Sequence, residues 1–223
     1  MKKKLVILGG GESGVGAALL AKQKRYDVFL SDESSLKEIY RMELQIAGIE
    51  FEEGRHTAEK ILNADEVMKS PGIPEKTEMV KKIRAKRIEI ISEIELAYRF
   101  KGNSKVIGIT GSNGKTTTTA LIYHICKTAA VDCALVGNIG FSFARQIAMD
   151  PKPLYVAEIS SFQLDDIKTF RPDVAILTNI TEDHLDRYEY KFENYIRSKF
   201  RIAMNQGKND HFIYCLDDEV TMK

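Results

Sequence analysis

The feature that decides the fold of this chain is a run of small and polar residues, Thr110-Gly111-Ser112-Asn113-Gly114-Lys115-Thr116-Thr117-Thr118. The apolar run at residues 105–109 precedes it and predicts a strand, and the residues after it predict a helix. Glycines let backbone N–H groups turn inward on phosphates, and a helix N-terminus adds partial positive charge. Lys115 can bridge the β- and γ-phosphates of a nucleotide, and the Thr116 hydroxyl can hold Mg²⁺. We therefore predict a loop that binds ATP through Gly111, Ser112, Asn113, Gly114, Lys115, Thr116 and Thr117.

Strands and helices alternate on both sides of this loop. Before it, the pattern predicts strands at residues 5–8, 27–31, 64–69 and 88–91, and helices at 14–24, 36–47, 75–86 and 93–100. After it, the pattern predicts strands at residues 154–158, 174–178 and 210–215. Such alternation indicates parallel sheets covered by helices. We predict an α/β fold with two domains: a Rossmann-like domain over residues 1–93 and an incomplete phosphate-loop domain over residues 94–223.

The bulk composition excludes several classes of protein. The chain has 223 residues, of which 43% are hydrophobic, so it can form a core. A net charge of +1 gives no reason to expect a nucleic-acid partner. No stretch approaches the roughly 20 apolar residues that span a bilayer. Cys126, Cys133 and Cys215 show neither metal-binding nor disulfide spacing. These features predict a cytoplasmic protein without a membrane or nucleic-acid partner.

A second glycine-rich turn lies near the N-terminus. Gly9-Gly10-Gly11-Glu12-Ser13-Gly14 follows the strand predicted at residues 5–8, and Asp32 ends the next strand. This spacing satisfies the dinucleotide fingerprint, in which glycines approach a diphosphate and an acid meets the ribose. Taken alone, the turn favours an NAD-dependent dehydrogenase.

Polar residues also follow two strands beyond the phosphate loop. Glu158 ends one predicted strand, and His184 lies in a polar cluster after the next. Open α/β sheets place their ligands at the carboxyl ends of strands, and carboxylates there suit Mg²⁺. The residues alone leave open whether Glu158 is a metal ligand or a surface acid, and whether His184 is functional.

Several motifs resemble those of the Mur ligase family. The loop at residues 110–117 is similar to the ATP loop of Mur ligases and folylpolyglutamate synthases. The strict phosphate-loop pattern would place its first glycine at position 109, where this chain has Ile109. That glycine is displaced in this chain as it is in the family. Residues 158–164, Glu-Ile-Ser-Ser-Phe-Gln-Leu, resemble the D-glutamate-adding members of the family. Residues 179–188 resemble the family's Asn-x-x-x-Asp-His-Leu-Asp segment, and residues 137–140 resemble its Gly-Asn-Ile-Gly turn.

The resemblance implies roles for individual residues. It implies that Asn138 binds the sugar-peptide substrate and that His184 lies near a second metal ion and the substrate carboxylate. It also implies that carbon dioxide carbamylates Lys199, which converts an ammonium into a group with anionic oxygens that Mg²⁺ prefers. The implied ligands of two Mg²⁺ ions are Thr116, Glu158, His184 and Lys199. The implied catalytic residues are Lys115, His184 and Lys199.

The resemblance further implies an ATP-dependent amide ligase that adds D-glutamate to UDP-N-acetylmuramoyl-L-alanine through an acyl phosphate. The first domain of the family grips the UDP part of that substrate. By matched position, the UDP site consists of Glu12, Ser13, Asp32, Glu33, Ser34 and Gly72. The family has a third domain that the resemblance does not cover. We therefore expect this chain alone to bind the UDP substrate, to turn over poorly and to be a monomer.

Four other interpretations compete with the one just given. The chain could be a fragment that binds a UDP-sugar without chemistry, or a different Mur-type ligase. It could also be the dehydrogenase that the N-terminal turn favours, or a generic phosphate-loop kinase or GTPase. The displaced glycine and the absence of an Asn-Lys-x-Asp stretch argue against a GTPase.

Overall fold

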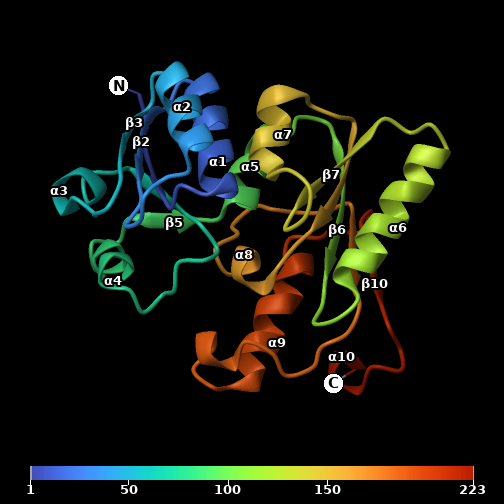
Figure 1. The fold of residues 1–223 in the computed structure, drawn as a ribbon. Coiled ribbons are helices and arrows are strands. Elements are labelled where there is room, and N and C mark those ends of the chain that lie inside the picture. The colour runs from blue at the N-terminus through green and yellow to red at the C-terminus, as the bar shows by residue number, and fades with distance from the viewer. Residues whose placement is uncertain (1, 223) are drawn as a thin grey trace. The chain divides into compact units, whose positions relative to one another are not determined.

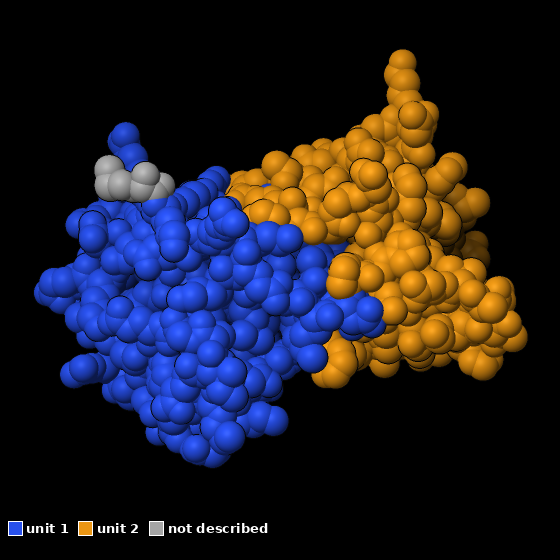
Figure 2. All heavy atoms as spheres, turned by 90° about the horizontal axis from the view of Figure 1, so that it is seen from above, with its two compact units in different colours: residues 1–97, 142–150 blue, residues 98–141, 151–223 orange. Residues whose placement is uncertain are grey.

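The computed structural model describes residues 2–222 and forms two compact units. Unit 1 comprises residues 1–97 and 142–150, and unit 2 comprises residues 98–141 and 151–223 (Figure 2). The sequence predicted a domain boundary at residue 93, but it did not predict that residues 142–150 belong to unit 1. The exact extent of the two domains stays a prediction.

Unit 1 is built on a parallel sheet of five strands, in the order β3-β2-β1-β4-β5. The strands are β1 (Lys4–Leu8), β2 (Asp27–Ser31), β3 (Glu50–Glu52), β4 (Glu66–Lys69) and β5 (Glu89–Ile91). The helices are α1 (Glu12–Gln23), α2 (Glu38–Ile46), α3 (Ala58–Ile61), α4 (Glu78–Ala85) and α5 (Glu93–Phe100) (Figure 1). All four apolar residues of β1 are buried, because helices cover both faces of a central parallel strand.

Helix α7 (Phe143–Met149) packs on α1 within unit 1, although it lies far along the chain. Gly16 permits this packing, because a Cβ atom there would lie 2.1 Å from Ser142 Oγ. The buried Arg145 guanidinium then pairs with Glu12 at 2.8 Å and with Glu43 at 2.9 Å. No local pattern predicts this attachment, since both partners of each contact are distant in sequence.

Unit 2 is built on a second parallel sheet, in the order β10-β9-β6-β8-β7. The strands are β6 (Lys105–Thr110), β7 (Cys133–Gly137), β8 (Leu154–Glu158), β9 (Val174–Leu177) and β10 (His211–Tyr214). The α-helices are α6 (Lys115–Thr128), α8 (Ser161–Asp165), α9 (Phe192–Phe200) and α10 (Glu219–Met222), and two 3₁₀ turns span Leu185–Arg187 and Arg201–Ala203 (Figure 1). The chain leaves β8 and crosses to β9 on the other side of β6. Such a reversal of strand order makes the carboxyl ends of β6, β8 and β9 the expected place for a ligand.

The α/β fold class predicted from the sequence is confirmed, and each predicted strand is present. The sequence interpretation missed the strands β3 and β7 and the helices α3, α7, α8 and α10. Among residues 2–222, no helix has the length and apolar character needed to cross a membrane.

Candidate active site

The phosphate loop connects β6 to α6 in unit 2, as the sequence predicted. Gly111 and Gly114 have φ values of +148° and +78°, which few residues other than glycine adopt. The Lys115 ammonium donates hydrogen bonds to the carbonyl oxygens of Gly111 and Ser112, each at 2.8 Å. Its charge is therefore held inside the loop, while the Thr116 and Thr117 side chains are exposed at the start of α6. This arrangement places a cation and a helix N-terminus where a phosphate can bind.

The loop is fastened to the segment that follows β9. The backbone N–H groups of Ser112 and Asn113 donate to Asn179, at its carbonyl and side-chain oxygens respectively, both at 2.9 Å. The Thr178 hydroxyl donates to the Asn113 carbonyl at 2.7 Å, and the Ser112 hydroxyl donates to the Thr181 carbonyl at 2.9 Å. Residues 178–181 thus hold the loop in shape, a role that the sequence did not reveal.

Replacing Gly111 with alanine is expected to lower the free energy of unfolding by about 3 kcal/mol. The new Cβ atom would lie 1.9 Å from Thr178 Oγ1 and 3.1 Å from the Asn179 carbonyl oxygen, so the loop and its support must separate. Urea denaturation of the two proteins measures the difference. Gly102→Ala is the control, because Gly102 also has a positive φ, +62°, but has nothing near its Cβ position. Equal losses in both variants would show that the contact with Thr178 is unimportant.

Lys199 approaches the same loop from α9. Its side chain is 1% exposed, and its ammonium donates to the Gly111 carbonyl oxygen at 2.7 Å and lies 4.6 Å from the centre of the Tyr195 ring. Burial, followed by repulsion from Lys115, lowers the pKa of Lys199 to about 7. A substantial fraction of this amine is therefore uncharged near neutral pH, and an uncharged amine is the form that can react with carbon dioxide.

Glu158 ends β8, beside the phosphate loop. It pairs with Ile109 of β6 across the sheet and is 1% exposed. Its Oε1 atom accepts a hydrogen bond from the Asn138 side chain at 2.8 Å, whereas Oε2 is buried without a hydrogen-bond partner. The Thr110 hydroxyl oxygen, at the end of the adjacent strand, is also buried without a partner. Two unsatisfied oxygens at adjacent strand ends fit a bound cation.

The oxygen atoms around Glu158 suit Mg²⁺ better than they suit a metal ion whose ligands are all protein side chains. Within residues 2–222, no three His, Cys, Asp or Glu side chains group as a metal site. Mg²⁺ commonly binds through one or two carboxylates together with water and the phosphates of its substrate. One carboxylate beside a phosphate loop agrees with that mode of binding.

His184 lies in the turn before Leu185–Arg187. Its ring is 5.1 Å from the Phe162 ring of α8, and its Nε2 atom is 3.4 Å from an Asp183 carboxylate oxygen. The side chain is 53% exposed. No hydrogen bond within residues 2–222 joins His184 to Glu158 or Lys199, so its role as a ligand stays a prediction.

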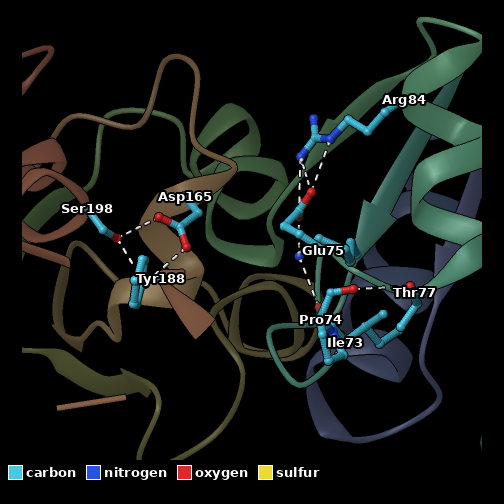
Figure 3. Close-up of polar contacts among 9 residues, drawn as sticks. Ile73, Pro74, Glu75, Thr77, Arg84, Asp165, Tyr188 and Ser198 are labelled. Carbon is cyan, nitrogen blue, oxygen red and sulfur yellow. Dashed lines mark hydrogen bonds and ion pairs between the residues drawn. The ribbon is translucent and has the colours of Figure 1, made fainter. Parts of the chain in front are cut away.

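A buried hydrogen-bond network holds α9 against α8. Ser198 Oγ lies 2.6 Å from Asp165 Oδ1, and the Tyr188 hydroxyl donates to Asp165 Oδ2 at 3.1 Å (Figure 3). The Ser198 hydroxyl also lies 2.9 Å from the Ser161 carbonyl oxygen. Because Ser198 precedes Lys199, this network positions the buried lysine. The sequence interpretation missed it, since its members come from three separate segments.

Unit 1 contains a cavity of about 760 Å³ at the carboxyl ends of its strands. Of the residues predicted to bind UDP, Asp32, Glu33, Ser34 and Gly72 line this cavity. The Asp32 carboxylate accepts hydrogen bonds from the Gly10 N–H at 2.5 Å and the Ser34 N–H at 2.7 Å, and so ties the glycine turn to the end of β2. Glu12 and Ser13 are not among the residues that form the cavity wall.

Another part of the cavity wall is the loop from Gly72 to Thr77, which is held by contacts within it and by contacts to β4 and α4. The Thr77 hydroxyl donates to the Pro74 carbonyl oxygen at 3.1 Å, and Arg84 pairs with Glu75 at 3.3 Å (Figure 3). Lys69, whose side chain is 3% exposed, pairs with Glu75 at 3.1 Å. These contacts give the loop from Gly72 to Thr77 a fixed shape along the cavity.

Comparison with known proteins agrees with this geometry. A family model of the Mur ligase middle domain matches residues 109–223, and a model of the MurD N-terminal domain matches residues 4–79. The UDP-N-acetylmuramoylalanine–D-glutamate ligase of Cytophaga hutchinsonii is 59% identical over 221 residues, which are 99% of this chain and 49% of that protein. The enzyme of the same name from Bacteroides fragilis is 55% identical over 218 residues, 98% of this chain and 49% of that protein. The chain thus spans about half the length of the curated relatives it matches.

A solved structure supports the fold. The UDP-N-acetylmuramate:L-alanyl-gamma-D-glutamyl-meso-diaminopimelate ligase of Neisseria meningitides aligns with a TM-score of 0.66 at 19% identity, over 100% of this chain and 74% of that one. At that identity the likeness concerns the fold alone. The match of the middle-domain model covers more than half of this sequence and includes the phosphate loop, Glu158, His184 and Lys199. This chain belongs to the Mur ligase family.

Proposed function

We propose that this chain carries the UDP-binding and ATP-binding parts of a ligase that joins D-glutamate to UDP-N-acetylmuramoyl-L-alanine. The names of the relatives, at 53–59% identity over nearly the whole chain, support this choice of substrates. One observation carries the proposal. Lys115 and Lys199 both donate hydrogen bonds to the Gly111 carbonyl oxygen at the end of β6, and the neighbouring strand β8 ends at Glu158, which has an unpartnered carboxylate oxygen. We place the reaction in cytoplasmic peptidoglycan precursor synthesis and expect a monomer.

The proposed reaction has two steps. The carboxylate of the UDP-linked alanine attacks the γ-phosphorus of ATP and forms an acyl phosphate as ADP leaves. The amine of D-glutamate then attacks the acyl carbon, loses a proton and expels phosphate, which leaves an amide. Phosphoryl transfer depends mainly on positioning and charge neutralisation.

The residues of this chain supply that positioning. Residues 111–117 would hold the triphosphate, with Lys115 on the β- and γ-phosphates. Thr116, Glu158, His184 and a carbamate on Lys199 would hold two Mg²⁺ ions, which neutralise charge on the transferring phosphoryl group when bound. Asn138, which orients the Glu158 carboxylate, would also meet the sugar-peptide substrate. Asp32, Glu33, Ser34 and Gly72 would bind UDP in unit 1, and Glu12 and Ser13 stay predicted members of that site.

The proposal predicts two separate nucleotide sites, one for UDP and one for ATP. Calorimetric titration of the chain with UDP, and then with a non-hydrolysable ATP analogue and Mg²⁺, is expected to show two independent binding events. Saturation with UDP should not block the analogue, because the two ligands use different sheets. Binding of UDP without the analogue would favour a UDP-binding fragment, and competition of NADH with UDP would favour a dehydrogenase.

A further inference from the structure

The unit 1 cavity has a histidine in its wall that belongs to no sequence motif. His56 follows β3 and lines the cavity together with Asp32 and Ser34. Its Nδ1 atom lies 2.7 Å from the hydroxyl oxygen of Ser31, a fully buried residue at the end of β2. The contact with Ser31 therefore fixes the Nδ1 side of the imidazole ring.

The hydrogen bonds behind His56 determine which ring nitrogen carries the proton. The Ser31 hydroxyl lies 2.8 Å from Glu52 Oε1 and 3.4 Å from the Arg55 carbonyl oxygen, so the carboxylate is its better acceptor. Glu52 also accepts from Thr57, at 2.7 Å from N–H and 2.5 Å from the hydroxyl. Burial raises the pKa of Glu52, but the bonds from Thr57 and Ser31 outweigh burial and lower that pKa overall. The carboxylate is thus ionised and can only accept.

It follows that the neutral imidazole carries its hydrogen on Nδ1. The Ser31 proton is committed to Glu52, so the contact between Ser31 and His56 needs a hydrogen from the ring. The other nitrogen, Nε2, is then a hydrogen-bond acceptor. It has no hydrogen-bond partner among the residues that the structure describes, and a ligand in the cavity can satisfy it by donating a hydrogen.

The order of the strands indicates which part of a nucleotide supplies that donor. In this type of sheet the diphosphate lies at the glycine turn after the first strand, and the ribose lies at the end of the second. His56 follows β3, which is the next strand outward from β2. A nucleotide extended along this edge places its base near His56. Uracil has an N3–H donor, whereas N3 of cytosine is an acceptor and would face Nε2 with repulsion.

We propose that His56 selects uracil over cytosine by accepting a hydrogen bond from the uracil N3–H, with Ser31 and Glu52 fixing the required tautomer. This inference rests on the proposed UDP site and adds a specificity-determining residue to it. The site would then be specific for uridine nucleotides, beyond any preference for a diphosphate.

Calorimetric titration with UDP and with CDP tests the proposal. At about pH 8, the unchanged chain should bind UDP at least about 10-fold more tightly than CDP. His56→Phe should reduce that ratio to near one, because UDP loses the acceptor for its N3–H and CDP loses the repulsion from Nε2. Ser31→Ala should also lower the ratio, because it frees the ring to adopt the other tautomer.

The controls separate this inference from a loss of folding and from the proposed function itself. His124→Phe changes an exposed histidine on α6 in unit 2 and should leave both affinities unaltered. Retained CDP binding shows that a variant is folded. If UDP binds but His56→Phe keeps the wild-type ratio, the role of His56 is wrong and the UDP site stands. If the unchanged chain binds neither UDP nor CDP, the proposed UDP site fails, and this inference fails with it.

Discussion

Replacing Lys115 with methionine is expected to weaken binding of the ATP analogue by at least about 100-fold and to leave UDP binding unchanged. The Lys115 ammonium already lies inside the phosphate loop, 2.8 Å from each of two carbonyl oxygens. A triphosphate that binds there would exchange those neutral acceptors for charged ones, which form stronger hydrogen bonds. Methionine keeps most of the side-chain volume and removes only the charge and the donors.

Parallel calorimetric titrations of the analogue and of UDP measure this effect. Lys127→Met is the matched control, because Lys127 lies in the last turn of the same helix and is exposed. It removes the same charge from α6 and should change the affinity for the analogue less than about 2-fold. An equal loss in both variants would mean that net charge, and not the loop geometry, governs binding. An unaffected Lys115→Met protein would contradict the role of this loop.

The parts of the fold that the sequence predicted correctly share a physical cause. Central parallel strands are buried on both faces, so they appear as unbroken apolar runs, as in Leu5–Leu8 and Tyr155–Ala157. Glycines that end such runs mark the turns into helices. These two signals are local, and they were sufficient to predict the fold class and the phosphate loop.

Both missed strands lie at sheet edges, and one of them, β3, lacks that local signal. Strand β3 is Glu50-Phe51-Glu52, in which charged residues alternate with one aromatic residue. Strand β7 is Cys133-Ala134-Leu135-Val136-Gly137, an apolar run like those of the predicted strands, and the sequence interpretation used only the turn that begins at its last residue. An edge strand is paired on one side only, so its sequence need not be apolar throughout.

The supporting contacts of the candidate site could not be predicted for a different reason. Asn179 holds Asn113, Asn138 orients Glu158, and Ser31 fixes His56, and the partners lie 66, 20 and 25 residues apart. Single polar residues carry no periodic signal, so only the folded chain reveals which of them meet. The sequence therefore predicts many of the residues proposed to touch the nucleotides, and the structure adds His56 and the residues that hold the others in place.

Replacing Lys199 with methionine is expected to raise the free energy of unfolding at pH 7 by about 2 kcal/mol, because a gain of about 4 kcal/mol is partly offset by loss of the hydrogen bond to Gly111. The gain arises because burial, with repulsion from Lys115, holds the pKa of Lys199 at about 7 against an ordinary 10.5. The unfolded chain therefore binds more protons than the folded chain between those pH values. By linkage, the free energy of unfolding of the wild-type chain increases as the pH rises from about 7 to about 10.5. The destabilisation caused by the buried ammonium is therefore greatest at and below about pH 7.

Urea denaturation of both proteins between about pH 7 and pH 10 measures this difference, in buffer free of carbon dioxide. The advantage of Lys199→Met should shrink as the pH rises, because the wild-type lysine then becomes neutral in both states. Lys127→Met is again the control, since an exposed lysine should show no such trend. A methionine variant that is less stable than wild type at pH 7 would mean that the hydrogen bond to Gly111 outweighs the cost of burial.

The uncharged amine of Lys199, which burial favours, is a nucleophile. The amine can attack carbon dioxide, form an N–C bond and release a proton, which leaves an anionic carbamate beside Lys115 and the phosphate loop. With ¹³C-labelled bicarbonate and Mg²⁺, the wild-type chain should give a carbamate carbon signal in NMR spectra that Lys199→Met lacks and Lys127→Met retains. A signal that persists in Lys199→Met would assign the carbamate to another amine. A wild-type chain that gives no such signal would contradict the carbamylation of Lys199.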